Sequence, residues 1–314
     1  MNPVKAAIAA NRFGLGAKPG ELGGIERPES WLLDQLQGPS RTPAELRELP
    51  DSASVLVEAQ ALRQAQREAR GETEDVVQKY GRWARGHYVQ QAAARYRHAA
   101  VTDLPFHERL VHFWSNHFAV SADKQPLPTI AGLMENEAIR PNVAGHFHDL
   151  LLAVETHPAM ILYLDNQRSI GPNSTLAKRA SRRRRNQQVG LNENLAREIL
   201  ELHTLGVDGG YTQDDVTSVA RVITGWSIGG AGERGRFADG EPGHFEFREA
   251  IHEPGTQTVL GKRYAQSGMK QGQAVLRDLA THPSTARFVS TKLARHFVAD
   301  EPPSRLVDRM VETW

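Results

Sequence analysis

Hydrophobic side chains recur every three to four residues through most of the chain, the spacing of amphipathic helices. Residues 104–118 form the densest such segment, rich in aromatic, aliphatic and histidine side chains that a partly buried helix would accommodate. Further helices are predicted over 128–140, 149–165 with a break at His157-Pro158, 191–205, 212–223, 271–281 and 284–298. The pattern therefore predicts a mainly α protein.

Residues 43–99 are rich in Ala, Arg, Gln and Glu, which favour helices. A break near Gly71 divides this region into two helices. Sustained heptads are missing, so we predict a helical hairpin that packs on the body of the protein rather than a coiled coil.

The pattern changes after residue 227, where glycines become frequent and His244 to Arg248 alternates like a strand. Together with the apolar run before Tyr264, this predicts a small β-hairpin near residues 244–264. The expected fold is thus a mainly α, multi-helix globular domain that spans residues 1–314 as one unit.

Two further segments are predicted from composition. Residues 167–190 are polar and contain Lys178, Arg179 and the cluster Arg182–Arg185, which predicts a basic mobile loop. The last helical pattern ends in Trp314 without a cap, so we expect the domain to be truncated at its C-terminus.

Composition excludes several classes of protein. The chain has 314 residues, with 38 Lys and Arg against 37 Asp and Glu, and this near-neutral balance makes nucleic-acid binding an unfavoured function. It has no cysteine, which excludes disulfides, thiolate metal sites and cysteine nucleophiles. No membrane span and no ordinary secretory signal peptide are predicted, and the compartment stays undetermined.

The richest candidate chemistry lies in residues 192–206. On an α-helix, one face would hold four polar side chains at positions i, i+3, i+4 and i+7: Asn194, Arg197, Glu198 and Glu201. An adjacent apolar stripe would hold Leu195, Ile199, Leu202 and Leu205. Carboxylates close to an apolar stripe need partners when they are buried, such as an arginine, a metal ion or histidines from elsewhere.

Histidines and carboxylates of other helices are the candidate partners. His112 and His117 are five residues apart and point about 140° away from each other on a helix, so they do not form a two-ligand metal pair. Glu155 and His157 are a second source. The Glu-x-x-His spelling occurs at Glu241 and Glu249, within the predicted hairpin and loop region, where helical metal-site geometry is missing.

Three interpretations of this polar cluster remain open: a structural network, a metal centre and a metal-free acid–base site. For the acid–base site the predicted catalytic residues are Glu198, Glu201, His203, His117, Asn194 and Arg197. The predicted substrate-binding residues are Asn116, Trp114, Asp165 and Asn192. Metal ligands are not assigned.

Two other motifs each allow two interpretations. Gly225-Trp226-Ser227-Ile228-Gly229 has the spelling of a nucleophile elbow, but a helical pattern precedes it, which favours a helix end that continues into a turn. The cluster Arg182–Arg185 indicates either binding of an anionic polymer or a solvated loop.

Several blocks resemble a bacterial family catalogued as domain of unknown function 1800. The longest is residues 190–212, which read GLNENLAREILELHTLGVDGGYT. Supporting blocks follow in the family's order over essentially the whole chain: Asn11–Gly16, Phe113–Phe118, His157–Met160, Tyr163–Asn166 and Thr224–Trp226.

The resemblance implies a helical protein without assigned catalytic residues. It also implies that relatives are often longer, are often exported, and have genes beside one for a sulfatase-like protein. One hypothesis is therefore a hydrolase-like enzyme acting on an envelope or extracellular polymer. The alternatives are a non-catalytic partner or scaffold of a sulfatase-like enzyme, and anionic-polymer binding through Arg182–Arg185. Cofactors, oligomeric state and compartment stay open.

Overall fold

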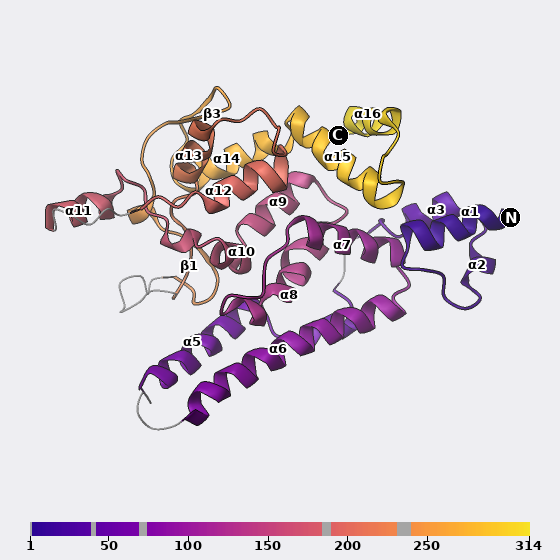
Figure 1. The fold of residues 1–314 in the computed structure, drawn as a ribbon, viewed down its shortest axis with the longest axis horizontal. Coiled ribbons are helices and arrows are strands. Elements are labelled where there is room, and N and C mark those ends of the chain that lie inside the picture. Colours follow the sequence, from indigo (N-terminus) through magenta and orange to yellow (C-terminus); the bar gives the residue numbers. More distant parts are fainter. Residues whose placement is uncertain (1, 39–41, 69–73, 184–189, 231–239) are drawn as a thin grey trace.

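The computed structural model describes residues 2–38, 42–68, 74–183, 190–230 and 240–314 (Figure 1). The α-helices are α1 (Pro3–Ile8), α2 (Glu21–Gly24), α3 (Pro28–Asp34), α4 (Ala44–Arg47), α5 (Ser52–Glu68), α6 (Glu74–Val101), α7 (Pro105–His117), α8 (Ala131–Met134), α9 (Phe147–Glu155), α10 (Pro158–Tyr163), α11 (Thr175–Arg183), α12 (Asn194–Glu198), α13 (Gln213–Val222), α14 (Met269–Ala280), α15 (Pro283–Phe297) and α16 (Ser304–Thr313). The predicted mainly α fold is confirmed.

Shorter helical turns connect or extend these elements. The 3₁₀ turns are η2 (Leu127–Thr129), η4 (Arg140–Asn142), η5 (Asn166–Arg168) and η8 (Glu249–Ile251). The π-helical segments are η1 (Ala9–Phe13), η3 (Glu135–Ile139) and η6 (Ile199–Thr204). Within the described ranges, no helix is long and apolar enough to cross a membrane.

One large hydrophobic core joins α7 to α10 and α12 to α15. Its fully buried side chains include Val111, Phe118, Leu151, Met160, Leu195, Val219 and Leu276. Two of the helices that line it begin in the same way, because His157 and His282 each precede a proline that opens the helix. The Nδ1 atom of each histidine accepts a hydrogen bond from a backbone N–H two residues later, at 3.1 Å.

Helices α5 and α6 lie side by side along the lower edge of the molecule in Figure 1. A small separate cluster of Ala59, Tyr80 and Ala84 packs between them. Trp83 of α6 also donates a hydrogen bond to Glu58 of α5 at 2.8 Å. The pair is also attached to the rest of the protein, because α6 packs against α4, η2 and α8, and Val55 near the N-terminal end of α5 belongs to the main core.

The described residues also form two small antiparallel sheets. Strands β3 (Gln257–Val259) and β4 (Lys262–Tyr264) form a hairpin, which confirms the prediction in that region. Strand β2 (Phe245–Phe247) instead pairs with β1 (Trp226–Ile228). Ser227 is therefore a fully buried strand residue that follows a helix, the reverse of the strand-to-helix order of a nucleophile elbow.

The expected loop over 167–190 is wrong for residues 175–183, which form helix α11. Ser174 begins this helix by accepting a hydrogen bond from the backbone N–H of Ala177 at 3.2 Å. Ala177 is buried, and α11 packs against η8, so a small apolar contact orders a strongly basic segment. The described part of the chain does not include residues 184–189 or the side chains of Arg182 and Arg183. The predicted binding of an anionic polymer through Arg182–Arg185 therefore lies outside the described residues.

The helix expected over 191–205 changes its geometry half-way. After α12 the chain widens into η6, where Leu205 N–H donates to Leu200 C=O at 3.0 Å, five residues back. The wider turn shifts the register, so Leu200 is fully buried while Leu202 is 45% exposed. The predicted apolar stripe is thus wrong at Leu202.

Candidate functional site

The predicted polar face of residues 194–201 lies on the outside of α12 and η6. Asn194 is exposed, and Glu198 is partly exposed. Arg197 lies 3.1 Å from Glu201 and 3.5 Å from Glu193, in half-exposed ion pairs one turn apart. Such pairs are typical of a solvated helix surface and contribute little to stability.

His203 and His117 lie in the core instead. His203 Nδ1 is 2.7 Å from the Oε1 atom of Glu155, and these side chains are 3% and 0% exposed. His117 Nε2 lies 3.1 Å from the backbone oxygen of His203. The edge of Trp114 packs against the His117 ring at 5.3 Å. Glu155, His203, His117 and Trp114 therefore form one buried cluster, which the polar face of α12 does not join.

Burial controls the protonation of His117. Desolvation, with help from the charge of Lys292, holds the pKa of His117 well below its usual range, so its ring is neutral at pH 7. Because these side chains are enclosed by aromatic rings, the cluster is suited to holding helices α7, α9 and η6 together.

Asp165 and Asn192 meet at a different place. Asp165 occupies a left-handed turn with φ of 58° and lies 2.5 Å from Lys124 Nζ. Asn192 donates hydrogen bonds from Nδ2 to the backbone oxygens of Leu164 at 2.9 Å and Asp165 at 3.2 Å. The amide of Asn192 thus fixes the turn by satisfying carbonyl groups that would otherwise lack a partner.

Helix α7 presents a second polar surface, which is accessible. Arg109, His112 and Asn116 share one side of the helix at positions i, i+3 and i+7, and each is partly or fully exposed. His112 and His117 point to different sides, as their spacing predicts. Among the predicted substrate-binding residues, Asn116 alone lies on this exposed face.

A buried ionic network supports this surface from beneath. Glu108 is fully buried, and both of its oxygens accept hydrogen bonds from the guanidinium of Arg140. His112 Nε2 lies 3.3 Å from one oxygen of Glu108, and His98 Nε2 lies 3.2 Å from the other. Burial alone would raise the pKa of Glu108, but hydrogen bonds from Arg140, His112 and His98 outweigh it and hold this pKa far below its usual range.

Glu135 of η3 extends the network. It accepts hydrogen bonds from Arg95 and Ser115, both at 2.7 Å, and lies 3.4 Å from Arg140. Ligand atoms of Glu108, His112 and Glu135 lie within 4.8 Å of one another, a spacing that could hold a metal ion. However, two arginines already neutralise the two carboxylates, so the geometry fits a charge-balanced support for His112 better than a cation site.

Positive charge gathers on the exposed side of His112. Arg109 Nε donates to His296 Nε2 of α15 at 3.3 Å. Arg12 of η1 reaches the end of the same helix. Burial lowers the pKa of His296, and the charges of Arg109 and His112 lower it further. Imidazole groups of two helices thus lie beside two guanidinium groups at an accessible position.

Comparison with known families identifies the family of this chain. A family model described as a protein of unknown function, DUF1800, matches residues 8–314. The chain belongs to the DUF1800 family. No curated protein and no solved structure matches it.

The sequence reasoning missed the supporting network of this DUF1800 protein. Glu108 and His112 are four residues apart, a spacing that places them on one side of a helix and could have indicated their contact. Glu135 and Arg140 come from η3 and its continuation, over 20 residues further along. Only the packing of α7 against η3 brings them to Glu108.

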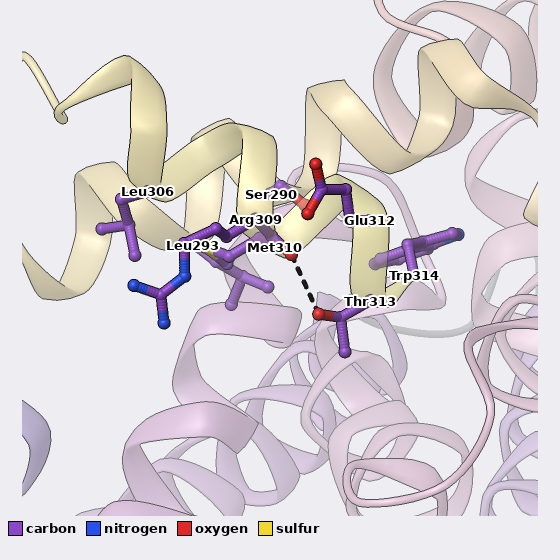
Figure 2. A pocket seen from close by; sticks show the side chains of 8 residues that line it. All are labelled: Ser290, Leu293, Leu306, Arg309, Met310, Glu312, Thr313 and Trp314. Atoms are coloured by element: carbon purple, nitrogen blue, oxygen red, sulfur yellow. Dashed lines mark hydrogen bonds between the residues drawn. The ribbon is translucent and has the colours of Figure 1, made fainter.

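A groove lies on another part of this DUF1800 protein, between α15 and α16 (Figure 2). Leu293, Leu306, Met310 and Trp314 supply its apolar walls, while Arg309 and Glu312 lie at its edge. Ser290 also lines it, and its Oγ is buried without a hydrogen-bond partner among the described residues. The groove is separate from the histidines of α7 and is suited to an amphipathic ligand.

Proposed function

We propose that this DUF1800 protein is an enzyme that hydrolyses an envelope or extracellular polymer by acid–base catalysis at His112. The observation that supports this proposal is the position of His112: its ring is partly exposed, while Glu108, a buried carboxylate, lies 3.3 Å from Nε2. A carboxylate behind an accessible imidazole orients the ring and stabilises its protonated form, which favours acid–base catalysis.

In the proposed reaction, Nδ1 of His112 takes a proton from water as the water attacks the scissile bond. Glu108 stabilises the positive charge that the ring acquires, because Arg140 holds its carboxylate ionised and fixed. The imidazolium then returns the proton to the leaving oxygen, so the histidine ends unchanged. Asn116, one turn along α7, is placed to bind a polar group of the substrate.

Replacement of His112 by glutamine tests the proposal. The assay measures how fast the purified protein releases new chain ends from a panel of bacterial envelope and extracellular polysaccharides. We expect the rate of the H112Q variant to be about 100- to 10,000-fold lower than that of the wild type. The fold and melting temperature should stay close to those of the wild type, because the ring is partly exposed.

Two control variants make this test specific. His244→Gln removes a more exposed histidine from another surface and should keep full activity. His203→Gln changes the buried cluster and should lower stability more than turnover. Activity of H112Q equal to that of H244Q would overturn the proposed role of His112.

We also propose a second function, as a non-catalytic partner of a sulfatase-like protein, which the groove of Figure 2 supports. Its apolar walls and unpartnered Ser290 hydroxyl fit a segment of another protein. Light scattering on a mixture with a sulfatase-like protein of the kind whose genes adjoin those of relatives tests this. We expect the two proteins to form a complex that Met310→Glu prevents and that Leu202→Glu does not affect. Two separate proteins in the wild-type mixture would contradict the proposal.

A further inference from the structure

We infer that the substrate of this site bears anionic groups, carboxylate or sulfate, which Arg12, Arg109 and Lys292 bind beside His112. The inference rests on the proposed function and specifies its substrate class. It is based on how these three side chains are held and on what surrounds them.

The two arginines are fixed by neutral acceptors. Arg12 Nη1 donates to the backbone oxygen of Val298 at 2.5 Å. Arg109 Nη1 donates to the backbone oxygen of Gly14 at 2.9 Å, and its Nε faces His296. Backbone oxygens orient a guanidinium without cancelling its charge, and each group keeps further N–H donors for a ligand.

Lys292 of α15 is the third cation. It lies four residues before His296, and its ammonium group is 5.3 Å from the centre of the Phe288 ring. Burial lowers the pKa of Lys292, and its charge contributes to lowering the pKa of His117 on α7. The lysine therefore lies close to α7, one turn of α15 before His296, whose pKa the charge of His112 affects.

None of these three cations pairs with a carboxylate in the part of the chain that the structure describes. Arginines elsewhere do pair with carboxylates: Arg95, Arg140, Arg168, Arg197, Arg248 and Arg287. The whole chain has a net charge of only +1, so the surplus at this site is local. Burial lowers the pKa of Arg109, and the charge of Arg12 lowers it further, which an incoming anion would relieve.

Planar guanidinium groups bind carboxylate and sulfate oxygens through paired N–H donors. Repeated acidic groups on a polysaccharide would therefore position a neighbouring linkage against His112. A neutral polymer offers these cations no compensating charge. The substrate class that fits is consequently an acidic polysaccharide, with sugar carboxylates or sulfate esters as its two forms.

Binding to three defined polymers tests the inference. We expect the full chain to bind polygalacturonate or dextran sulfate measurably in calorimetry at 0.1 M salt, and to bind neutral dextran at least about tenfold more weakly. The two acidic polymers distinguish carboxylate from sulfate recognition. Equal binding of all three polymers, or none, would overturn the inference.

Substitutions locate the binding. Arg12→Gln and Lys292→Gln should each weaken binding about tenfold, and Arg109→Lys should also weaken it, because lysine keeps the charge but loses the planar fork. Arg263→Gln removes one exposed positive charge on β4 and is the matched control. An equal loss in R12Q, K292Q and R263Q would show general charge attraction and contradict the inference.

The His112→Gln variant separates the two proposals. If H112Q binds the acidic polymer as the wild type does, the inference stands even where no hydrolysis is found. If H112Q is inactive while R12Q, K292Q and R109K bind and turn over normally, the catalytic proposal stands and the anion site is wrong.

Discussion

At the scale of residues, Glu108 depends most on its partners. A fully buried carboxylate is costly to desolvate, and Arg140, itself 1% exposed, compensates it through two hydrogen bonds. His98 and His112 approach the same carboxylate from two helices. Orientation of the proposed catalytic histidine therefore depends on an arginine that has no contact with solvent.

We predict that Arg140→Met destabilises the protein by about 3–5 kcal/mol, because it leaves the buried charge of Glu108 without its guanidinium partner. Urea unfolding followed by circular dichroism measures this. Arg168→Met, at an arginine that is 76% exposed and 3.7 Å from Asp165, should cost less than about 1 kcal/mol. The double variant E108Q/R140M should be more stable than R140M alone, and no such recovery would contradict the explanation by an unpaired charge.

At the scale of elements, the π-helical segments determine which side chains face the core. In η6 the wider turn brings Leu200 and His203 inward together and turns Leu202 outward. Thr204 stabilises this geometry, since its Oγ1 donates to the backbone oxygen of Ile199 at 2.5 Å. The segment η3 similarly directs Glu135 towards Arg95 and towards Arg140 of the following turn.

Two alanine substitutions, two residues apart, test this register. Leu200→Ala should destabilise the fold by about 2–5 kcal/mol, as expected for a fully buried leucine. Leu202→Ala should change stability by less than about 0.5 kcal/mol, because its side chain is on the surface. Chemical denaturation of both variants measures the difference. Comparable losses would indicate the α-helical register instead.

At the scale of the whole molecule, α15 joins regions that are distant in the sequence. Phe297 stacks on Phe13 of η1 at 5.5 Å, and Phe106 of α7 contacts both rings. This contact brings Arg12 of η1 close to Arg109 of α7 and to the end of α15, the helix that carries Lys292. The acid–base and anion-binding proposals therefore both depend on how the N-terminal segment docks against α7 and α15.

Acid should destabilise the whole protein in two stages. Below the ordinary histidine pKa of 6.5, the unfolded chain takes up a proton at His117 that the folded protein refuses, which costs up to about 1.4 kcal/mol per pH unit. Below the ordinary glutamate pKa of 4.5, the unfolded chain also protonates Glu108, while the folded protein keeps this carboxylate ionised. Stability is thus expected to be greatest above pH 6.5 and to fall in both stages.

Melting temperatures from pH 8 to pH 4 measure this behaviour. His117→Gln should make the melting temperature depend less on pH between pH 6.5 and pH 5, whatever it does to the stability at pH 8. The reason is that the variant lacks the group that takes up a proton on unfolding. Exposed His244 provides the control, since H244Q should retain the wild-type slope. A wild-type slope in H117Q would show that other groups cause the acid loss.

The fold class and most of the helices could be predicted from the amino-acid pattern alone. Periodic apolar residues, and the prolines after His157 and His282, mark segments that favour a helix locally. The same segments bury an apolar side as helices, so local preference and packing favour the same structure. The blocks at residues 113–118 and 190–212 also indicated the family. Residue spacing alone separated His112 from His117 on α7, because helical geometry is local.

Which side chains meet could not be predicted, because it depends on how the helices pack. A π-helical turn in η6 changes the register without a clear local signal, and it separates His203 from the exposed Arg197 and Glu201. Arg140 reaches Glu108, and Arg12 reaches the end of α15, across 32 and 286 residues. Long-range charge pairing depends on how helices dock, and helix periodicity contains no information about docking.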